Sequence, residues 1–168
     1  MYQVYIGLGS SIGDRLENLS RAVDEIRSIA NIQAVSSVYK TESVEMENET
    51  TFFNMVIAIE TPNDAPLLLA MLKKIEKKMG RKLPSHGEPR IIDLDILMYR
   101  GVAYEDRFVR VPHPRMEYRR FVLEPLAEIA PTAVHPTLEK TIATLLRNCH
   151  DTHKVTRTEY HINYSTIN

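Results

Sequence analysis

The segment Ile91-Ile92-Asp93-Leu94-Asp95-Ile96-Leu97-Met98-Tyr99 carries most of the evidence for the architecture of this 168-residue chain. Its nearly continuous apolar character predicts a buried strand, because short apolar runs bounded by turn residues are typical of strands. Polar residues 81–90, with Pro84, Gly87 and Pro89, predict a loop before it. Gly101 follows the segment and is expected to end it.

The elements upstream of this strand predict the rest of a sheet. Helical spacing of apolar residues predicts one helix capped by Asp14, and a second that begins at Asn63 or Asp64 and ends at Gly80. Apolar, β-branched and aromatic runs predict strands over residues 2–8, 35–39 and 52–60. The order β-α-β-β-α-β predicts a ferredoxin-like α+β fold, in which helices cover one face of an antiparallel sheet. The other face is then free for a site.

The C-terminal part of the chain adds further elements to this unit. We expect short strands within residues 102–111 and helices over residues 121–129 and 141–148. The tail from residue 150 to 168 alternates loosely, which predicts an added strand or an ordered tail. Because no repeat or linker is evident, residues 1–168 are interpreted as one domain.

Composition narrows the class of protein. Hydrophobic residues make up 43% and charged residues 26%, as in globular proteins. A formal net charge of −1 gives no overall field that would steer nucleic acid or an anionic membrane. A single cysteine, Cys149, excludes an intramolecular disulfide. Without a membrane-length apolar run, we expect a cytoplasmic protein.

Asp93 and Asp95 form the sharpest candidate site. Alternation along a strand places both on one face, with α-carbons roughly 6.5 to 7 Å apart. Two such carboxylates can bind Mg²⁺, which prefers a few carboxylates together with phosphate oxygens and water. An isolated pair of this kind is more often solvated. Here the apolar surroundings, in which aspartate is disfavoured, favour a site.

Cationic residues flank this acidic pair. Charge on a transferring phosphoryl group is stabilised by fixed guanidinium groups, so the cluster indicates polyphosphate binding, although each arginine alone could be a solvated surface residue. His113 lies between Pro112 and Pro114, which suits either a rigid phosphate contact or a solvated turn. The cluster comprises Arg81, Lys82, Arg90, Arg107, Arg110, Arg115, Arg119 and Arg120.

Two further motifs are weaker. The glycines of the segment 7–13 do not have the spacing of a dinucleotide fingerprint, so we interpret them as a tight turn with close backbone approach. Phe52 and Asn54 share a strand face, so a ring and an amide could stack on and hydrogen-bond to a flat heterocycle. Aromatic residues at such positions are otherwise most often part of the core.

Several ordered motifs together resemble the 6-hydroxymethyl-7,8-dihydropterin pyrophosphokinase family, also called 2-amino-4-hydroxy-6-hydroxymethyldihydropteridine diphosphokinase. The resemblance runs from Val4 to about Pro136. It implies a ferredoxin-like fold, two Mg²⁺ ions, and pyrophosphoryl transfer from ATP to the hydroxymethyl group of the pterin in folate biosynthesis, with no obligate protein partner. The motifs are Tyr5-Ile6-Gly7-Leu8-Gly9-Ser10, residues 36–41, Phe52-Phe53-Asn54, residues 89–97, Val111-Pro112-His113-Pro114-Arg115-Met116 and residues 119–126.

The resemblance also implies a role for individual residues. Asp93 and Asp95 would hold the metal ions, and these two with Arg90 would be catalytic. The residues implied at the nucleotide are Glu76, Arg81, Arg90, Ile96, Arg110, His113 and Arg119. Those implied at the pterin are Thr41, Val44, Phe52, Asn54 and Phe121. The pterin hydroxyl would attack the β-phosphorus and AMP would leave.

Two alternatives stay open at this point. The family usually has Trp-Gly where this chain has Gly87-Glu88, which is compatible with a divergent member that binds pterin or nucleotide with weak or no turnover. The same strand order also occurs in RNA-binding modules. That interpretation is disfavoured by the slightly negative charge and by the lack of an aromatic and basic strand motif.

Overall fold

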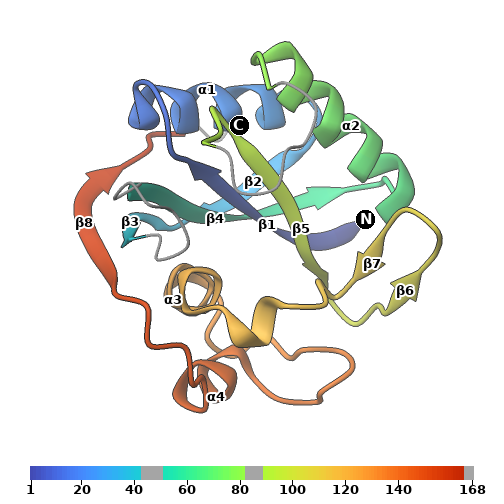
Figure 1. The fold of residues 1–168 in the computed structure, drawn as a ribbon. Coiled ribbons are helices and arrows are strands. Elements are labelled where there is room, and N and C mark those ends of the chain that lie inside the picture. Colours follow the sequence, from blue (N-terminus) through green and yellow to red (C-terminus); the bar gives the residue numbers. More distant parts are fainter. Residues whose placement is uncertain (43–50, 82–88, 165–168) are drawn as a thin grey trace.

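A twisted antiparallel sheet forms the centre of the protein (Figure 1), whose computed structural model describes residues 1–42, 51–81 and 89–164. Its strand order is β5-β1-β4-β3-β8, and β2 also pairs with β4. These strands are β1 (Tyr2–Ser10), β2 (Asn31–Val35), β3 (Ser37–Glu42), β4 (Thr51–Thr61), β5 (Asp93–Tyr99) and β8 (Val155–His161). Every pairing in this sheet is antiparallel.

The βαββαβ order is confirmed, with one strand divided in two. The predicted strand over residues 35–39 is the junction of β2 and β3, both of which pair with β4. Ser36 separates them. Its hydroxyl accepts a hydrogen bond from the Val56 N–H at 2.9 Å and donates to the Ser37 carbonyl at 2.8 Å. The Ser36 N–H still donates to the Val56 carbonyl at 2.9 Å, so the Ser36 hydroxyl replaces a backbone acceptor only for the Val56 N–H.

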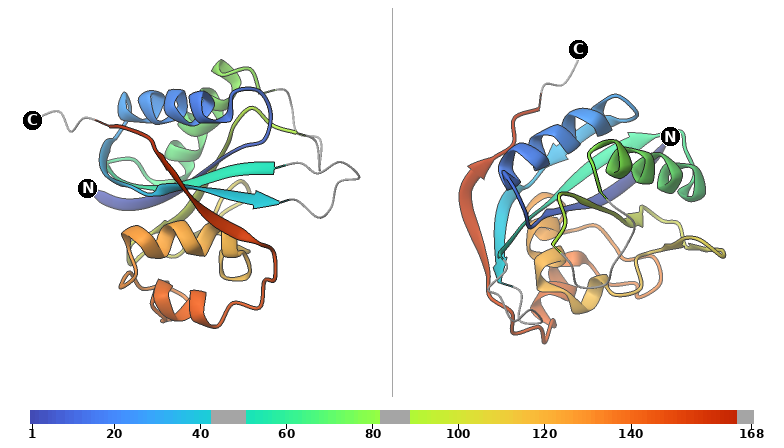
Figure 2. Two further views of the ribbon diagram at one scale, coloured as in Figure 1. Left: turned by 90° about the vertical axis from the view of Figure 1, so that its left-hand side faces the viewer. Right: turned by 45° about the horizontal axis from the view of Figure 1, so that its top comes forward.

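Helices α1 (Arg15–Arg27) and α2 (Ala65–Lys78) cover one face of the sheet, as predicted (Figure 2). Asp14 caps α1 by accepting the Glu17 N–H at 3.1 Å, and Asp64, rather than Asn63, caps α2 by accepting the Leu67 N–H at 3.1 Å. Such caps satisfy N–H groups that have no partner within the helix. The local sequence signals therefore mark both helix starts correctly.

The C-terminal helices α3 (Arg120–Ile129) and α4 (Ile142–Arg147) lie on the opposite side of the sheet (Figure 2). They bury Tyr5, Val56, Leu97 and Met98 of that face in a second core. The β1–β5 register shifts between Tyr5 and Ile6, which is how the consecutive residues Leu97 and Met98 both reach this core. The face that was expected to be free is thus open only in part.

Two expectations for the C-terminal region are confirmed. A small hairpin of β6 (Tyr104–Glu105) and β7 (Arg110–Val111) follows β5, and the tail adds β8 to the free edge of β3. Within the described part of the chain, no helix has the length and apolar character that crossing a bilayer requires.

Candidate active site

A cleft of about 460 Å³ lies over the part of the sheet that α3 leaves uncovered. Its walls come from β5, β1, β4 and β3, from the start of α3, and from the segment that precedes β8. It contains eight of the residues proposed from the sequence: Thr41, Phe52, Asn54, Arg90, Asp93, Asp95, Arg119 and Phe121. Segments far apart in the chain therefore meet in one cavity.

Asp93 and Asp95 share a face of β5, as the alternation predicted. Leu94 and Ile96 point the other way, into the core beneath α1 and α2. On the neighbouring strand β1, Gly9 is the register partner of Asp93 and Gly7 that of Asp95. Because glycine has no side chain, β1 places no side chain of its own beside either carboxylate.

The interpretation of Gly7 and Gly9 as parts of a turn was wrong, although close backbone approach is real. Both lie inside β1, which continues to Ser10. A Cβ on Gly9 would come within 2.8 Å of the Asn54 Oδ1, whereas one on Gly7 would meet Leu97 at an ordinary 3.4 Å. Gly9 thus provides the space that the Asn54 amide occupies.

Asn54 and Phe52 lie together in the cleft, on the face of β4 that the sequence predicted. Asn54 is only 7% exposed, and its amide nitrogen donates to the Thr41 hydroxyl at 3.0 Å. Phe53 points to the other side, where the Arg15 guanidinium lies 4.2 Å from its ring centroid. The amide is therefore held in one orientation toward the cavity.

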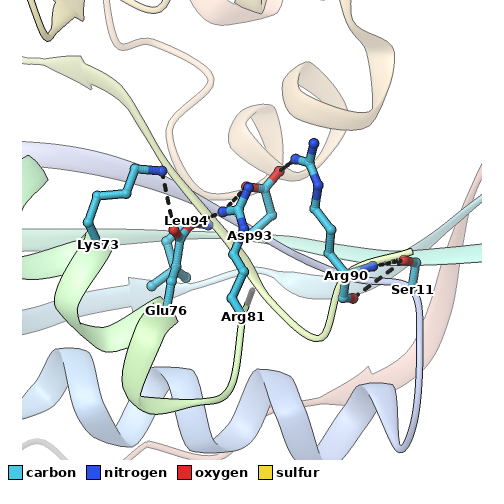
Figure 3. Close-up of polar contacts among 7 residues, drawn as sticks. All are labelled: Ser11, Lys73, Glu76, Arg81, Arg90, Asp93 and Leu94. Atoms are coloured by element: carbon cyan, nitrogen blue, oxygen red, sulfur yellow. Dashed lines mark hydrogen bonds and ion pairs between the residues drawn. The ribbon is translucent and has the colours of Figure 1, made fainter. Parts of the chain in front are cut away.

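A network of charged groups surrounds Asp93 (Figure 3). Arg81 lies 2.8 Å from one carboxylate oxygen and Arg90 lies 3.1 Å from the other. Arg81 is also paired with Glu76, which is 3% exposed and accepts the Leu94 N–H at 2.8 Å. The Ser11 hydroxyl accepts the Arg90 N–H at 2.8 Å and so fixes the start of the strand.

Asp95 has an electrostatic environment that favours a cation. Burial and the nearby negative charge of Asp93 raise the pKa of Asp95 to about 6, although Lys73 and Arg119 act in the opposite direction. Carboxylate oxygens are the ligands that Mg²⁺ prefers, so both aspartates fit this ion chemically. No group of three or more acidic, histidine or cysteine ligands occurs among the described residues, so phosphate oxygens and water would have to complete the coordination.

Arg119 and Phe121 project into the cleft from the start of α3. The Arg119 guanidinium lies 5.5 Å from the centroid of the Phe121 ring, within the range of a cation–π contact. Phe121 comes from α3 and Phe52 from the sheet, so the two predicted aromatic residues border the cavity from different elements.

Other predicted residues lie outside the lining of the cleft. Glu76 and Ile96 are buried, Arg81 lies behind Asp93, and Arg110 is exposed on β7, where it faces Glu105 at 3.9 Å.

His113 is also outside the lining of the cleft. Burial and the charges of Arg119 and Arg115 lower the pKa of His113 to about 4. Val44 and the Gly87-Glu88 pair lie outside the described residues.

Several residues that line the cleft were not predicted from the sequence. Gly7 and Gly9 stand two apart in a strand, the same spacing that identified the aspartates. Tyr118, Asp151 and His153 come from segments whose packing against the sheet carries no local signal. A ferredoxin-like fold that combines an acidic pair, arginines, aromatic rings and a fixed amide in one cleft is typical of an enzyme of phosphoryl transfer to a small molecule.

Comparison with known proteins makes this class specific. The sequence model of the family described as 7,8-dihydro-6-hydroxymethylpterin-pyrophosphokinase (HPPK) matches residues 5–131. A 2-amino-4-hydroxy-6-hydroxymethyldihydropteridine pyrophosphokinase of Aquifex aeolicus is 38% identical over 140 residues, covering 83% of this chain and 88% of that protein. The enzyme of the same name from Bacillus subtilis is 42% identical over 127 residues, covering 74% and 76% respectively.

Other similar proteins are longer. The chain covers 21% of a folic acid synthesis protein of Dictyostelium discoideum, at 35% identity. It also covers 44% of the solved wild-type HPPK-DHPS of Plasmodium falciparum with pteroate, where 87% of this chain aligns with a TM-score of 0.71 and 14% identity. That likeness shows the fold.

The chain belongs to the HPPK family, and its function is pyrophosphoryl transfer from ATP to a hydroxymethyldihydropterin in folate biosynthesis. ATP is its co-substrate, and its substrates are small molecules. Neither the divergent nor the RNA-binding alternative is favoured by any of these similarities.

Proposed function

We propose that the cleft binds ATP with Mg²⁺ at its β5 end and the dihydropterin at its β3 and β4 end. One observation carries this assignment. Four adjacent strands contribute, in order, the acidic pair, Gly7 and Gly9, the Asn54 amide and the Thr41 hydroxyl. A charged polyphosphate and a flat polar ring thus each have a suitable part of one continuous surface.

Asp93 and Asp95 are the proposed Mg²⁺ ligands, and the family resemblance implies two ions. When bound there, Mg²⁺ would neutralise phosphate charge and orient the reacting oxygens. Arg90 and Arg119 would bind phosphate oxygens. Arg90 now pairs with Asp93, so it could exchange this partner for a phosphate when Asp93 binds a cation.

His113 is the other proposed phosphate contact. With its pKa lowered to about 4, its ring is neutral near pH 7 and would contribute a hydrogen bond rather than a charge. Contacts of Glu76, Arg81, Ile96, Arg110 and Val44 with the substrates stay predictions, as do the cytoplasmic location and the lack of an obligate protein partner.

For the pterin we propose stacking between Phe52 and Phe121, with hydrogen bonds from the Asn54 side chain. The hydrogen bond from the Asn54 amide nitrogen to Thr41 fixes the orientation of the Asn54 amide. A fixed amide supports recognition of one edge of the pterin ring. The pterin hydroxyl oxygen attacks the β-phosphorus in line, the bond to the α-phosphate oxygen breaks, and AMP departs. Positioning and charge stabilisation supply most of the acceleration.

Substitution of Asp95 by asparagine tests this assignment. Asp95→Asn keeps the side-chain volume but removes a carboxylate, so we expect AMP formation to fall at least about 100-fold. The matched control is Asp24→Asn, an exposed aspartate of α1 that pairs with Arg27 on the surface. An unchanged rate in Asp95→Asn would refute the metal-ligand assignment. Binding of dihydropterin and ATP without AMP formation by the wild type would favour the divergent alternative.

A further inference from the structure

The first turn of α3 is capped by a residue from a distant segment. Arg119, at the N-cap position, makes no capping bond through its side chain. Instead, the Asp151 carboxylate accepts the Arg120 N–H at 2.9 Å, across 31 residues of sequence. A carboxylate at a helix N-terminus satisfies a free N–H group and also interacts favourably with the helix dipole.

The Arg120 side chain strengthens this connection. It donates to the Asp151 carbonyl at 3.0 Å and to the Cys149 carbonyl at 3.1 Å. The segment around Asp151 is therefore fixed to the same helical turn that carries Arg119 and Phe121 into the cleft.

Asp151 also orients His153. Its carboxylate accepts the His153 backbone N–H at 3.0 Å and contacts the His153 Nδ1. The Asp151 side chain is 8% exposed, whereas that of His153 is 45% exposed. Because the carboxylate requires a proton on Nδ1, the neutral ring has its acceptor at Nε2.

The position of His153 is on the proposed pterin side of the cleft. Val155 is the register partner of Thr41, so His153 lies just beyond the end of β3, where Glu42 also borders the cavity. Asp95 lies on β5, at the opposite edge of the sheet from β8. His153 is thus far from the phosphate end of the site.

We propose that His153 determines specificity for the dihydropterin by accepting, through Nε2, a hydrogen bond from an N–H group on the edge of the ring. Asp151 is the positioning residue that fixes both His153 and the α3 turn carrying Phe121. This inference rests on the proposed location of the pterin. Both residues lie beyond the part of the chain that matches the family, residues 5–131.

Two amide substitutions separate substrate binding from a purely structural role. In His153→Gln the side-chain amide reaches the position of Nε2, whereas in His153→Asn it reaches that of Nδ1. We expect His153→Asn and His153→Ala to raise the KM for 6-hydroxymethyl-7,8-dihydropterin about fivefold, the effect of one hydrogen bond. His153→Gln should retain most of the wild-type KM. The KM for ATP should not change in any of the three.

His150→Ala is the matched control, because His150 is an exposed histidine of the same segment and does not line the cleft. Calorimetry with 6-hydroxymethyl-7,8-dihydropterin should give the same order of affinities. The inference about His153 would be overturned if His153→Asn but not His153→Gln kept the wild-type KM, or if His153→Ala left the pterin affinity unchanged. Either outcome would leave the proposed location of the pterin intact. A wild-type chain that does not bind the dihydropterin would overturn the proposed cleft as well.

Discussion

At the scale of single residues, Gly9 shows how an absent side chain can be part of a site. Its hydrogen occupies the place where a Cβ would approach the Asn54 Oδ1 to 2.8 Å. Gly9 is also the register partner of Asp93 on one side and of Asn54 on the other. One glycine therefore adjoins both the acidic pair and the amide.

We predict that Gly9→Ala lowers the free energy of unfolding by about 1 to 3 kcal/mol, the usual cost of overpacking. The methyl group should displace the Asn54 amide from Thr41, so the KM for the dihydropterin should also rise. Urea unfolding and initial rates measure the two effects.

A double-mutant cycle tests the proposed cause. In an Asn54→Ala background the colliding oxygen is absent, so Gly9→Ala should cost about 1 kcal/mol less than in the wild type. Equal costs in the two backgrounds would contradict a clash between Gly9 and Asn54.

At the scale of elements, Glu76 connects α2 to β5. Its carboxylate accepts the Leu94 N–H and pairs with Arg81, which in turn contacts Asp93 (Figure 3). The side chain of Glu76 is 4% exposed, while that of its other partner, Lys73, is 52% exposed. The buried Glu76–Arg81 pair is therefore expected to contribute more to stability than the exposed Glu76–Lys73 pair.

We predict that Glu76→Ala destabilises the protein by about 2 to 4 kcal/mol, because it leaves a buried N–H group unsatisfied and removes a partner of Arg81. Lys73→Ala removes only the exposed end of the network and should cost less than about 1 kcal/mol. Urea unfolding of both variants measures the difference. If Lys73→Ala were as destabilising as Glu76→Ala, the assignment of Glu76 as the connection would be wrong.

Some helices and strands were predicted from the sequence, whereas the division between β2 and β3 was not. The periodicity of apolar residues predicted α1, α2 and the face of β5 that carries both aspartates, because these patterns depend on backbone geometry within one segment. The division at Ser36 was missed. Its cause is a bond to Val56 on another strand, which the local pattern of residues 35–39 does not contain.

At the scale of the whole molecule, the described residues include three groups whose shifted pKa values affect how stability depends on pH between 7 and 5. Burial lowers the pKa of His113 to about 4 and also lowers that of His135, so both bind a proton less readily in the folded state. The pKa of Asp95 is raised to about 6, so Asp95 binds one more readily. Two histidines thus oppose one aspartate.

We predict that the free energy of unfolding decreases from pH 7 to pH 5, because the unfolded chain binds more protons in this range. His113→Gln should flatten this dependence. Asp95→Asn should steepen this dependence, because the variant lacks the carboxylate whose protonation stabilises the folded state as the pH falls. The same variant should be more stable than the wild type at pH 7, because it has no buried negative charge at this position. Urea unfolding at several pH values measures these slopes, and an unchanged slope in His113→Gln would contradict the prediction.

The sequence by itself determined the order of the elements apart from the division at Ser36, the cap of α1, and the shared faces of Asp93 with Asp95 and of Phe52 with Asn54. Each of these follows from the geometry of one short segment, and family resemblance added the chemistry. Only the tertiary structure decided that Gly9 lies between Asp93 and Asn54, that α3 covers part of the open face, and that Asp151 caps α3. Strand register and the docking of distant segments depend on which surfaces are buried together, and no local pattern encodes that choice.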